Sequence, residues 1–115
     1  MKVLVGTTGD DRSREAVTWA IERARSTGDD VTVAVVDREA VADRIRDRLA
    51  DAGLAADVRS LTGDPGSSLV ELAEREGFDQ LVIPGGDTSP MGKVDLDRLE
   101  EYVLLNARVT VTVVR

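Results

Sequence analysis

The stretch Val31-Thr32-Val33-Ala34-Val35-Val36 decides the fold class. It is an unbroken run of apolar and β-branched residues, with no charge between Asp30 and Asp37. Such a run is typical of a strand that is buried on both faces, because an exposed face would show polar residues at every second position. Strands of this kind occur in parallel sheets covered by helices, so the stretch predicts an α/β protein.

The rest of the chain alternates between apolar runs and segments with helical spacing. We expect helices that start near residues 11, 40, 65 and 96, and further strands at residues 2–5, 56–61, 80–83 and 108–115. Asp57 and Arg59 indicate that the strand at 56–61 lies at a sheet edge. This alternation predicts one domain over residues 1–115. Its core is a doubly wound, five-stranded parallel sheet of order 3-2-1-4-5 with helices on both faces.

Turn residues mark the boundaries of the expected helices. In Gly63-Asp64-Pro65, Asp64 has the side chain of an N-cap, and Pro65 suits the first helical position, where its missing N–H costs nothing. Glycine follows each of the first three helical segments, at Gly28, Gly53 and Gly77, and indicates where these helices end.

Cysteine and histidine are both missing from the sequence. Without cysteine there are no disulfides, thiol nucleophiles or cysteine zinc sites. Without histidine there is no Ser-His-Asp triad and no imidazole to act as a general base or metal ligand. We therefore expect no catalytic residues, no metal site and no enzymatic activity.

The charged residues give a net charge of −7, from 22 acidic and 15 basic side chains. A negative surface repels phosphate backbones, so we expect no nucleic acid partner. Aspartate outnumbers glutamate, and lysine occurs only as Lys2 and Lys93, which favours a halophilic acidic protein. An ordinary acidic protein rich in arginine is the alternative.

No apolar run reaches the roughly 20 residues that a membrane span needs. The chain opens on the strand at residues 2–5 rather than on the pattern of a signal peptide. We therefore expect no membrane association and a cytoplasmic location.

The longest connection in the predicted fold runs from Pro84 to Lys93, after the fourth strand. Its glycines Gly85, Gly86 and Gly92 would let backbone N–H groups approach an anion, at the end of a strand where open α/β sheets bind ligands. Gly92-Lys93 resembles the end of a P-loop, but the first glycine of that pattern and its Ser or Thr are missing. Binding of a small anion and a plain connecting loop both stay open.

Three acidic residues, Asp10, Asp11 and Asp37, follow the first two strands. Carboxylates gathered at the carboxyl ends of strands can hold magnesium, as in phospho-acceptor domains. The chain lacks the acceptor aspartate after a central strand and the lysine after the last strand that such domains need. We therefore favour helix capping by Asp11 and solvent exposure of the other two carboxylates.

The last strand, Val109-Thr110-Val111-Thr112-Val113-Val114, alternates in character and has no lysine or proline to protect a free edge. A second copy of the chain can cover such an edge in a two-fold dimer. We expect a homodimer with Val109, Val111 and Val113 in its interface. A half-exposed edge strand in a monomer is the alternative.

Four stretches together resemble the universal stress protein family. The most specific are Gly63-Asp64-Pro65 before an amphipathic helix and Glu101-Tyr102-Val103 before the last strand. The resemblance spans the whole chain, in residues 3–9 leading into 13–20, 31–37, 63–65 with 69–73, and 81–83 through 101–103 to 113–115. It implies a five-stranded parallel sheet and a homodimer built through the last strand.

Members of this family either bind ATP or do not. Binders carry an acidic residue at the end of the first strand, where this chain has Thr8. After the fourth strand they carry a spaced set of three glycines and a Ser or Thr, and the matching residues here are Pro84, Asp87, Asp97 and Arg98. The resemblance therefore implies that ATP is not a cofactor. A divergent site for ATP or another small anion would comprise Thr7, Thr8, Gly9, Val36, Gly85, Gly86, Gly92 and Lys93.

These observations leave two main hypotheses for the function. The favoured one is a stress-associated, non-catalytic dimer that has lost the nucleotide site and acts through a protein partner. The second is a nucleotide-binding member of the family with a divergent pocket. A third hypothesis, a flavodoxin-like module that binds another small anion, carries less weight.

Overall fold

The computed structural model describes residues 1–7, 11–36, 38–54, 56–85 and 98–114. Within these ranges strands and helices alternate in the order β1 (Lys2–Thr7), α1 (Asp11–Thr27), β2 (Asp30–Val36), α2 (Glu39–Asp51), β3 (Asp57–Leu61), α3 (Pro65–Arg75), β4 (Gln80–Pro84), α4 (Arg98–Asn106) and β5 (Thr110–Val114). None of these helices is both long enough and apolar enough to span a bilayer.

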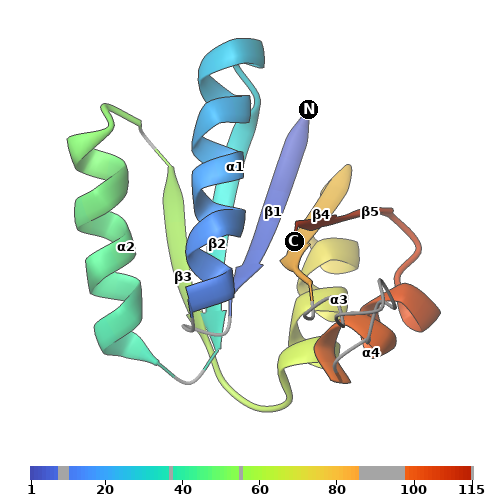
Figure 1. Cartoon of the computed structure of the whole chain (residues 1–115). Helices are drawn as coiled ribbons and strands as arrows, with labels where there is room; N and C mark the ends of the chain where they lie inside the picture. The colour runs from blue at the N-terminus through green and yellow to red at the C-terminus, as the bar shows by residue number, and fades with distance from the viewer. Residues whose placement is uncertain (8–10, 37, 55, 86–97, 115) are drawn as a thin grey trace, which may run out of the picture.

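The strands form one parallel sheet of order β3-β2-β1-β4-β5, which confirms the predicted topology (Figure 1). The decisive stretch, residues 31–36, lies in β2 between β1 and β3, and five of the six residues are buried apolar side chains. The strand that carries Asp57 and Arg59 is at one edge, as these charges indicated. The last strand, β5, is at the other edge.

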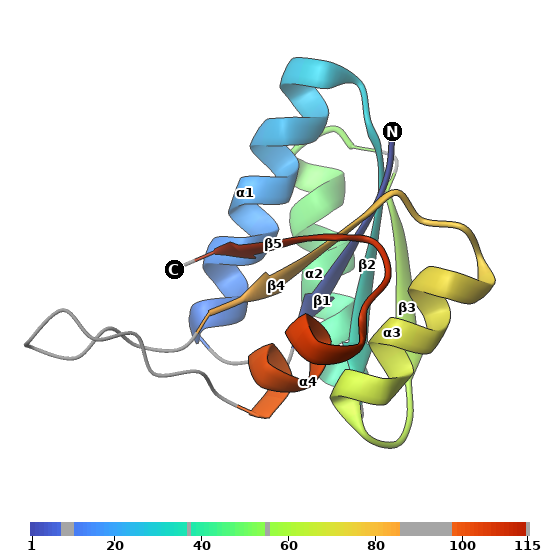
Figure 2. The ribbon, with the colours of Figure 1, turned by 90° about the vertical axis from the view of Figure 1, so that its right-hand side faces the viewer.

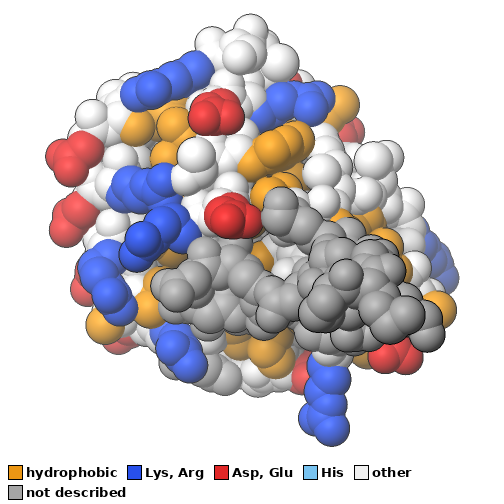
Figure 3. Space-filling model, in the orientation of Figure 1, with side chains coloured by type: hydrophobic (Ala, Val, Ile, Leu, Met, Phe, Trp, Pro, Cys, Tyr) orange, Lys and Arg blue, Asp and Glu red, His pale blue; other side chains and the backbone are white. Residues whose placement is uncertain are grey.

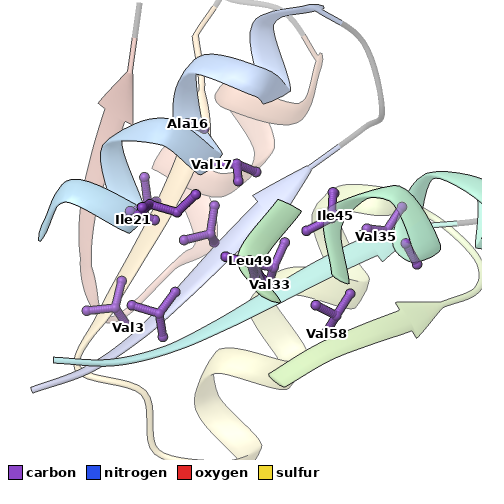
Figure 4. Close-up of a cluster of buried hydrophobic side chains, with 14 residues drawn as sticks. Val3, Ala16, Val17, Ile21, Val33, Val35, Ile45, Leu49 and Val58 are labelled. Atoms are coloured by element: carbon purple, nitrogen blue, oxygen red, sulfur yellow. The ribbon is translucent and has the colours of Figure 1, made fainter. Parts of the chain in front are cut away.

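The two faces of the sheet are covered by different helices, α1 and α2 on one side and α3 and α4 on the other (Figure 2). Side chains of β1 alternate between the two: Val3 and Val5 enter the core beneath α1 and α2, and Leu4 enters the core beneath α3 and α4. Figure 4 shows the first core, where Ile45 and Leu49 of α2 meet valines of the sheet. The sheet is therefore buried on both faces.

The predicted boundaries of the helices are largely confirmed. The Asp64 side chain accepts a hydrogen bond from the backbone N–H of Ser67, at 3.0 Å, and Pro65 is the first residue of α3. Gly53 has a φ of 73°, a conformation that suits glycine, and it lets the N–H of Leu54 donate back to the carbonyl of Leu49 at 3.0 Å.

Two strand boundaries differ from those expected by two residues, and others differ by one. β1 continues past Val5 to Thr7, because Gly6 and Thr7 still pair with β2. β5 starts at Thr110 rather than at residue 108, because its register sets Thr110 against Gln80, where β4 begins. Residues before Thr110 have no strand opposite them to pair with.

Helices α3 and α4 meet where Gly66 lies against the ring of Tyr102. A Cβ atom at Gly66 would lie 2.8 Å from Cδ1 and 2.9 Å from Cγ of this ring, closer than atoms of this kind pack. Only a residue without a side chain allows α4 to approach the first turn of α3 so closely. This contact fixes α4 beside the carboxyl edge of the sheet.

Two carboxylates are tied to the fold by basic groups. Arg59 of β3 forms an ion pair with Glu76, just after α3, and the hydrogen bond that Arg59 donates lowers the pKa of Glu76. A hydrogen bond from Thr27 lowers the pKa of Asp29, which also lies 3.3 Å from the N-terminal amine. Folding therefore stabilises the ionised form of both carboxyl groups.

Replacing Glu76 with Gln tests the pH dependence that follows. Because the folded-state pKa of Glu76 is lower than its ordinary value of 4.5, its ion pair stabilises the fold above that value and stops doing so as the pH falls through the lower one. We expect E76Q to melt at a lower temperature than the wild type near neutral pH, with a difference that disappears in strong acid. Circular dichroism melts across that range measure it.

Glu71→Gln is the matched control, because Glu71 pairs with Arg75 while both side chains are largely exposed. Exposed pairs of this kind add little stability. If E71Q lowers the melting temperature as much as E76Q does, the Arg59–Glu76 pair has no special role.

A double-mutant cycle tests the contact between α3 and α4. Alanine is ordinarily the better helix former by about 1 kcal/mol, yet Gly66→Ala should destabilise the protein by about 1–3 kcal/mol because its methyl group overlaps the Tyr102 ring. In a Tyr102→Ala background the same change should cost nothing or stabilise. Urea unfolding of the four proteins gives both values, and an equal cost in both backgrounds would show that Tyr102 is not the cause.

Candidate functional site

The candidate site lies at the carboxyl edge of the sheet, where the chain reverses its direction of winding. From β1 the chain winds outward through β2 to β3, and then crosses to β4 on the other side of β1. Ligands of open α/β sheets bind outside such a reversal point. The carboxyl ends of β1, β2 and β4 meet at this edge.

Three of the predicted site residues are brought to this edge. Thr7 ends β1, Val36 ends β2, and Gly85 directly follows β4. The other five, Thr8, Gly9, Gly86, Gly92 and Lys93, lie outside the described residues. The structure therefore describes the strand ends of the predicted site.

Thr7 is fully buried, and its hydroxyl group is used within the sheet. Its Oγ1 donates to the carbonyl oxygen of Ala34 on β2, at 3.2 Å. A buried hydroxyl without a partner would cost about 1–3 kcal/mol, which explains why the donor turns inward. The hydroxyl proton of Thr7 therefore bonds to β2 and is not offered to a ligand.

Gly85 is also buried, and its backbone N–H donates to the carbonyl of Val114 at 2.7 Å. The predicted role of this glycine was to offer a free amide to an anion. In the structure the amide extends the pairing of β4 with β5 by one residue. It holds the end of the last strand against the candidate site.

Val36 contributes an apolar side chain that is 5% exposed. It pairs with Leu61 of β3 and adds no polar group from its side chain. Among the three predicted residues that the structure describes, the two donors examined above are therefore already paired, and the third side chain is hydrophobic.

Two features near this edge were missed by sequence reasoning. A Cβ atom at Gly6 would lie 2.5 Å from Cδ1 of Leu69, so the residue before Thr7 must be small for α3 to cover β1. Glu100 is fully buried in α4, between the buried side chains of Leu99 and Val103. Its helical spacing from Val103 is the signal that places Glu100 on the inner face.

The sequence predicted no metal site. In the part of the chain that the structure describes, no three His, Cys, Asp or Glu side chains gather as a metal site would require. Asp10, Asp37 and the side chain of Asp11 lie outside that part. The choice between magnesium binding and helix capping at these aspartates stays a prediction.

The free edge of β5 borders the candidate site. Backbone N–H and C=O groups of successive residues in a strand point to opposite sides. The carbonyl of Val114 points to β4, so the backbone groups of Thr112 and Thr110 point to β4 as well. Those of Val111 and Val113 point to the open edge. The side chains of Val111 and Val113 pack on the core beneath α3 and α4. Val109, the third predicted interface residue, precedes the strand.

Comparisons of the sequence with protein-family models and with curated proteins found no match. Comparisons of the fold found many solved structures. A universal stress protein from Archaeoglobus fulgidus is 19% identical, with a TM-score of 0.82, and the alignment covers 99% of this chain and 97% of that one. A universal stress protein in complex with cAMP is 26% identical, with a TM-score of 0.80 and coverage of 100% and 96%.

A third solved structure comes from a plant. A universal stress protein family protein from Arabidopsis thaliana with AMP bound is 14% identical, with a TM-score of 0.73 and coverage of 99% and 90%. These matches extend over nearly the full length of both chains. The chain therefore has the fold of the universal stress proteins, the family that its sequence resembles.

Proposed function

We propose that this chain is a non-catalytic, stress-associated protein of the universal stress protein type, which forms a homodimer through β5 and acts on a protein partner in the cytoplasm without binding ATP. The observation that carries the proposal is the state of the candidate site. The N–H of Gly85 and the hydroxyl proton of Thr7 are both used in hydrogen bonds within the fold.

A nucleotide site needs donors that the fold has left free. Phosphate groups are held by unpaired backbone N–H groups at strand ends and helix starts. The amide of Gly85 is bonded to Val114, and the first turn of α3 is already capped by the carboxylate of Asp64. A carboxylate in that place repels a phosphate. The acidic residues Asp87 and Asp97, at positions where ATP-binding members carry glycine, add to this argument.

The proposed lack of enzymatic activity is supported by the residue types of the sequence and by the hydrogen bond of Thr7. The sequence has no histidine and no cysteine. Thr7 is a poor candidate for a nucleophile, because its hydroxyl donates to a carbonyl oxygen rather than to a general base. What this edge of the sheet supports is a binding or scaffolding role.

The proposed dimer is supported by the open edge of β5. At the opposite edge, β3 is protected by charged residues, since Arg59 pairs with Asp57 and with Glu76 and Arg46 donates to the carbonyl of Val58. β5 carries no charged residue between Thr110 and Val114. A second β5 strand, related by a two-fold axis, would satisfy the backbone groups of Val111 and Val113.

Replacing Val111 with Pro tests this dimer with little effect on the subunit. Proline removes an N–H that points to the open edge, and its apolar ring still packs on the core, so the pairing of β5 with β4 is kept. We expect V111P to elute as a monomer, and the wild type as a dimer, in size-exclusion chromatography with light scattering.

Ser60→Pro provides the matched control at the other edge. Ser60 is exposed on β3, two residues after Val58, so its backbone also points away from the sheet. This variant should stay dimeric. A dimer that survives V111P but not S60P would place the interface on β3 and overturn the proposal.

The second candidate function is nucleotide binding at a divergent site. It is favoured by two of the structural relatives, of which one is in complex with cAMP and the other has AMP bound. In such a site the phosphates would have to use donors other than the amide of Gly85 and the hydroxyl of Thr7.

Isothermal titration calorimetry with Mg-ATP, AMP and cAMP decides between the two functions. We expect no saturable binding at tens of micromolar ligand, because a micromolar complex needs about 8 kcal/mol and like charges oppose the triphosphate. Titrations at low and at molar salt control for screening of that repulsion. Binding of one nucleotide per subunit in either buffer would establish the second function instead.

A further inference from the structure

The boundary between α1 and α2 carries four arginines, which we call the arginine seam: Arg14 and Arg25 from α1, and Arg44 and Arg48 from α2. Two of them join the helices directly. The Nη1 of Arg48 donates to the carbonyl of Arg14 at 3.4 Å, and Nη2 of Arg25 donates to the carbonyl of Ala52 at 2.7 Å.

The other two arginines lie on the same surface by helical spacing. Arg48 also donates to the hydroxyl of Thr18. On α1, Arg14 lies four residues before Thr18, and on α2, Arg44 lies four residues before Arg48. Residues four apart share one face of a helix. Figure 3 shows basic side chains in a band over the α1–α2 side of this face of the molecule.

Within the described ranges, no carboxylate forms an ion pair with an arginine of the seam. The acceptors of Arg48 and Arg25 are carbonyl and hydroxyl oxygens, which leave a full positive charge on each guanidinium group. Among the described residues no ion pair involves any of the four, whereas ion pairs are formed by Arg23, Arg46, Arg59, Arg75 and Arg108. A cluster of four such cations is unusual on a chain of net charge −7.

We propose that the arginine seam binds an acidic segment of a partner protein. This inference rests on the proposed action through a protein partner and adds the chemistry of that partner. Guanidinium groups pair with carboxylates through two parallel hydrogen bonds, so an Asp- or Glu-rich segment is their natural complement.

The dimensions of the seam favour a peptide over a duplex. Arg14 and Arg25 are eleven residues apart on α1, which corresponds to about 16 Å along the helix axis and to about five residues of extended chain. Exposed acidic side chains border the seam at Glu15, Glu22 and Asp47. A single extended segment of this length can contact the arginines directly, whereas the wider phosphate surface of a nucleic acid duplex would also approach these carboxylates and be repelled by them.

Fluorescence anisotropy with labelled octaglutamate at low ionic strength tests the proposal. Among the described residues, the guanidinium groups of Arg14 and Arg44 make no hydrogen bond or ion pair, so we expect the variant R14Q/R44Q to keep the fold. We expect the wild type to bind octaglutamate and the variant to bind it more weakly, by about two- to fivefold per arginine removed. R14K/R44K, which keeps both charges, should retain most of the affinity.

The matched control is R75Q/R108Q, which removes the same charge from exposed positions outside the seam, where the side chains are 60% and 88% exposed. It should change the affinity by less than the loss of one seam arginine. Equal losses in the two double variants, or equal binding of octalysine, would overturn the proposal. Tighter binding of a short DNA duplex than of octaglutamate would also overturn it, in favour of nucleic acid.

Light scattering on the same samples separates this test from that of the proposed function. If the protein is dimeric but octaglutamate does not bind, the seam proposal is wrong while the dimer stands. If octaglutamate binds a monomer with the expected dependence on Arg14 and Arg44, the seam proposal holds while the proposed dimer is wrong.

Discussion

Strand β1 is the element on which the rest of the structure depends, because it pairs with β2 on one side and β4 on the other and sends side chains into both cores. Five of its six residues, Val3 to Thr7, are buried. Gly6 must lack a side chain for Leu69 to cover the strand, and Thr7 must give its hydroxyl proton to Ala34, because a buried donor without a partner is costly. The burial of β1 thus also explains why the hydroxyl group of Thr7, at the candidate site, donates within the sheet.

The same constraint links the candidate site to the proposed dimer edge. Gly85 follows the buried end of β4, and its amide is bonded to Val114, the last residue of β5. This hydrogen bond continues the β4–β5 ladder and sets which backbone groups of β5 point outward. A ligand that captured the Gly85 amide would have to break the last bond of the strand whose open edge we assign to the dimer. Nucleotide binding in that position and a firmly held β5 edge therefore oppose each other.

A feature could be predicted from the sequence when residues adjacent in the chain determine it. The strand at residues 31–36 and the cap at Asp64 could be predicted, because hydrophobic pattern and turn chemistry are written in adjacent residues. The start of β5 could not, because it is set by the point where β4 begins. The site was predicted at the ends of strands, but the acceptors that use the donors of Thr7 and Gly85 lie 27 and 29 residues away in the chain. No local pattern reports such pairings.

The net charge and the arginine seam illustrate how global and local electrostatics differ. The net charge of −7 predicts repulsion of polyanions at long range, yet at physiological salt that field is screened beyond about 8 Å. A segment in contact with the seam meets the local charges, which are four positive side chains bordered by Glu15, Glu22 and Asp47. In concentrated salt the screening length falls to about 3 Å, and only direct contacts keep their strength.

Arg25 and Arg48 are already held by carbonyl oxygens, so they lose less side-chain entropy when they bind a carboxylate than free arginines would. A preorganised seam would therefore bind an acidic partner through direct contacts under conditions in which the long-range repulsion is screened.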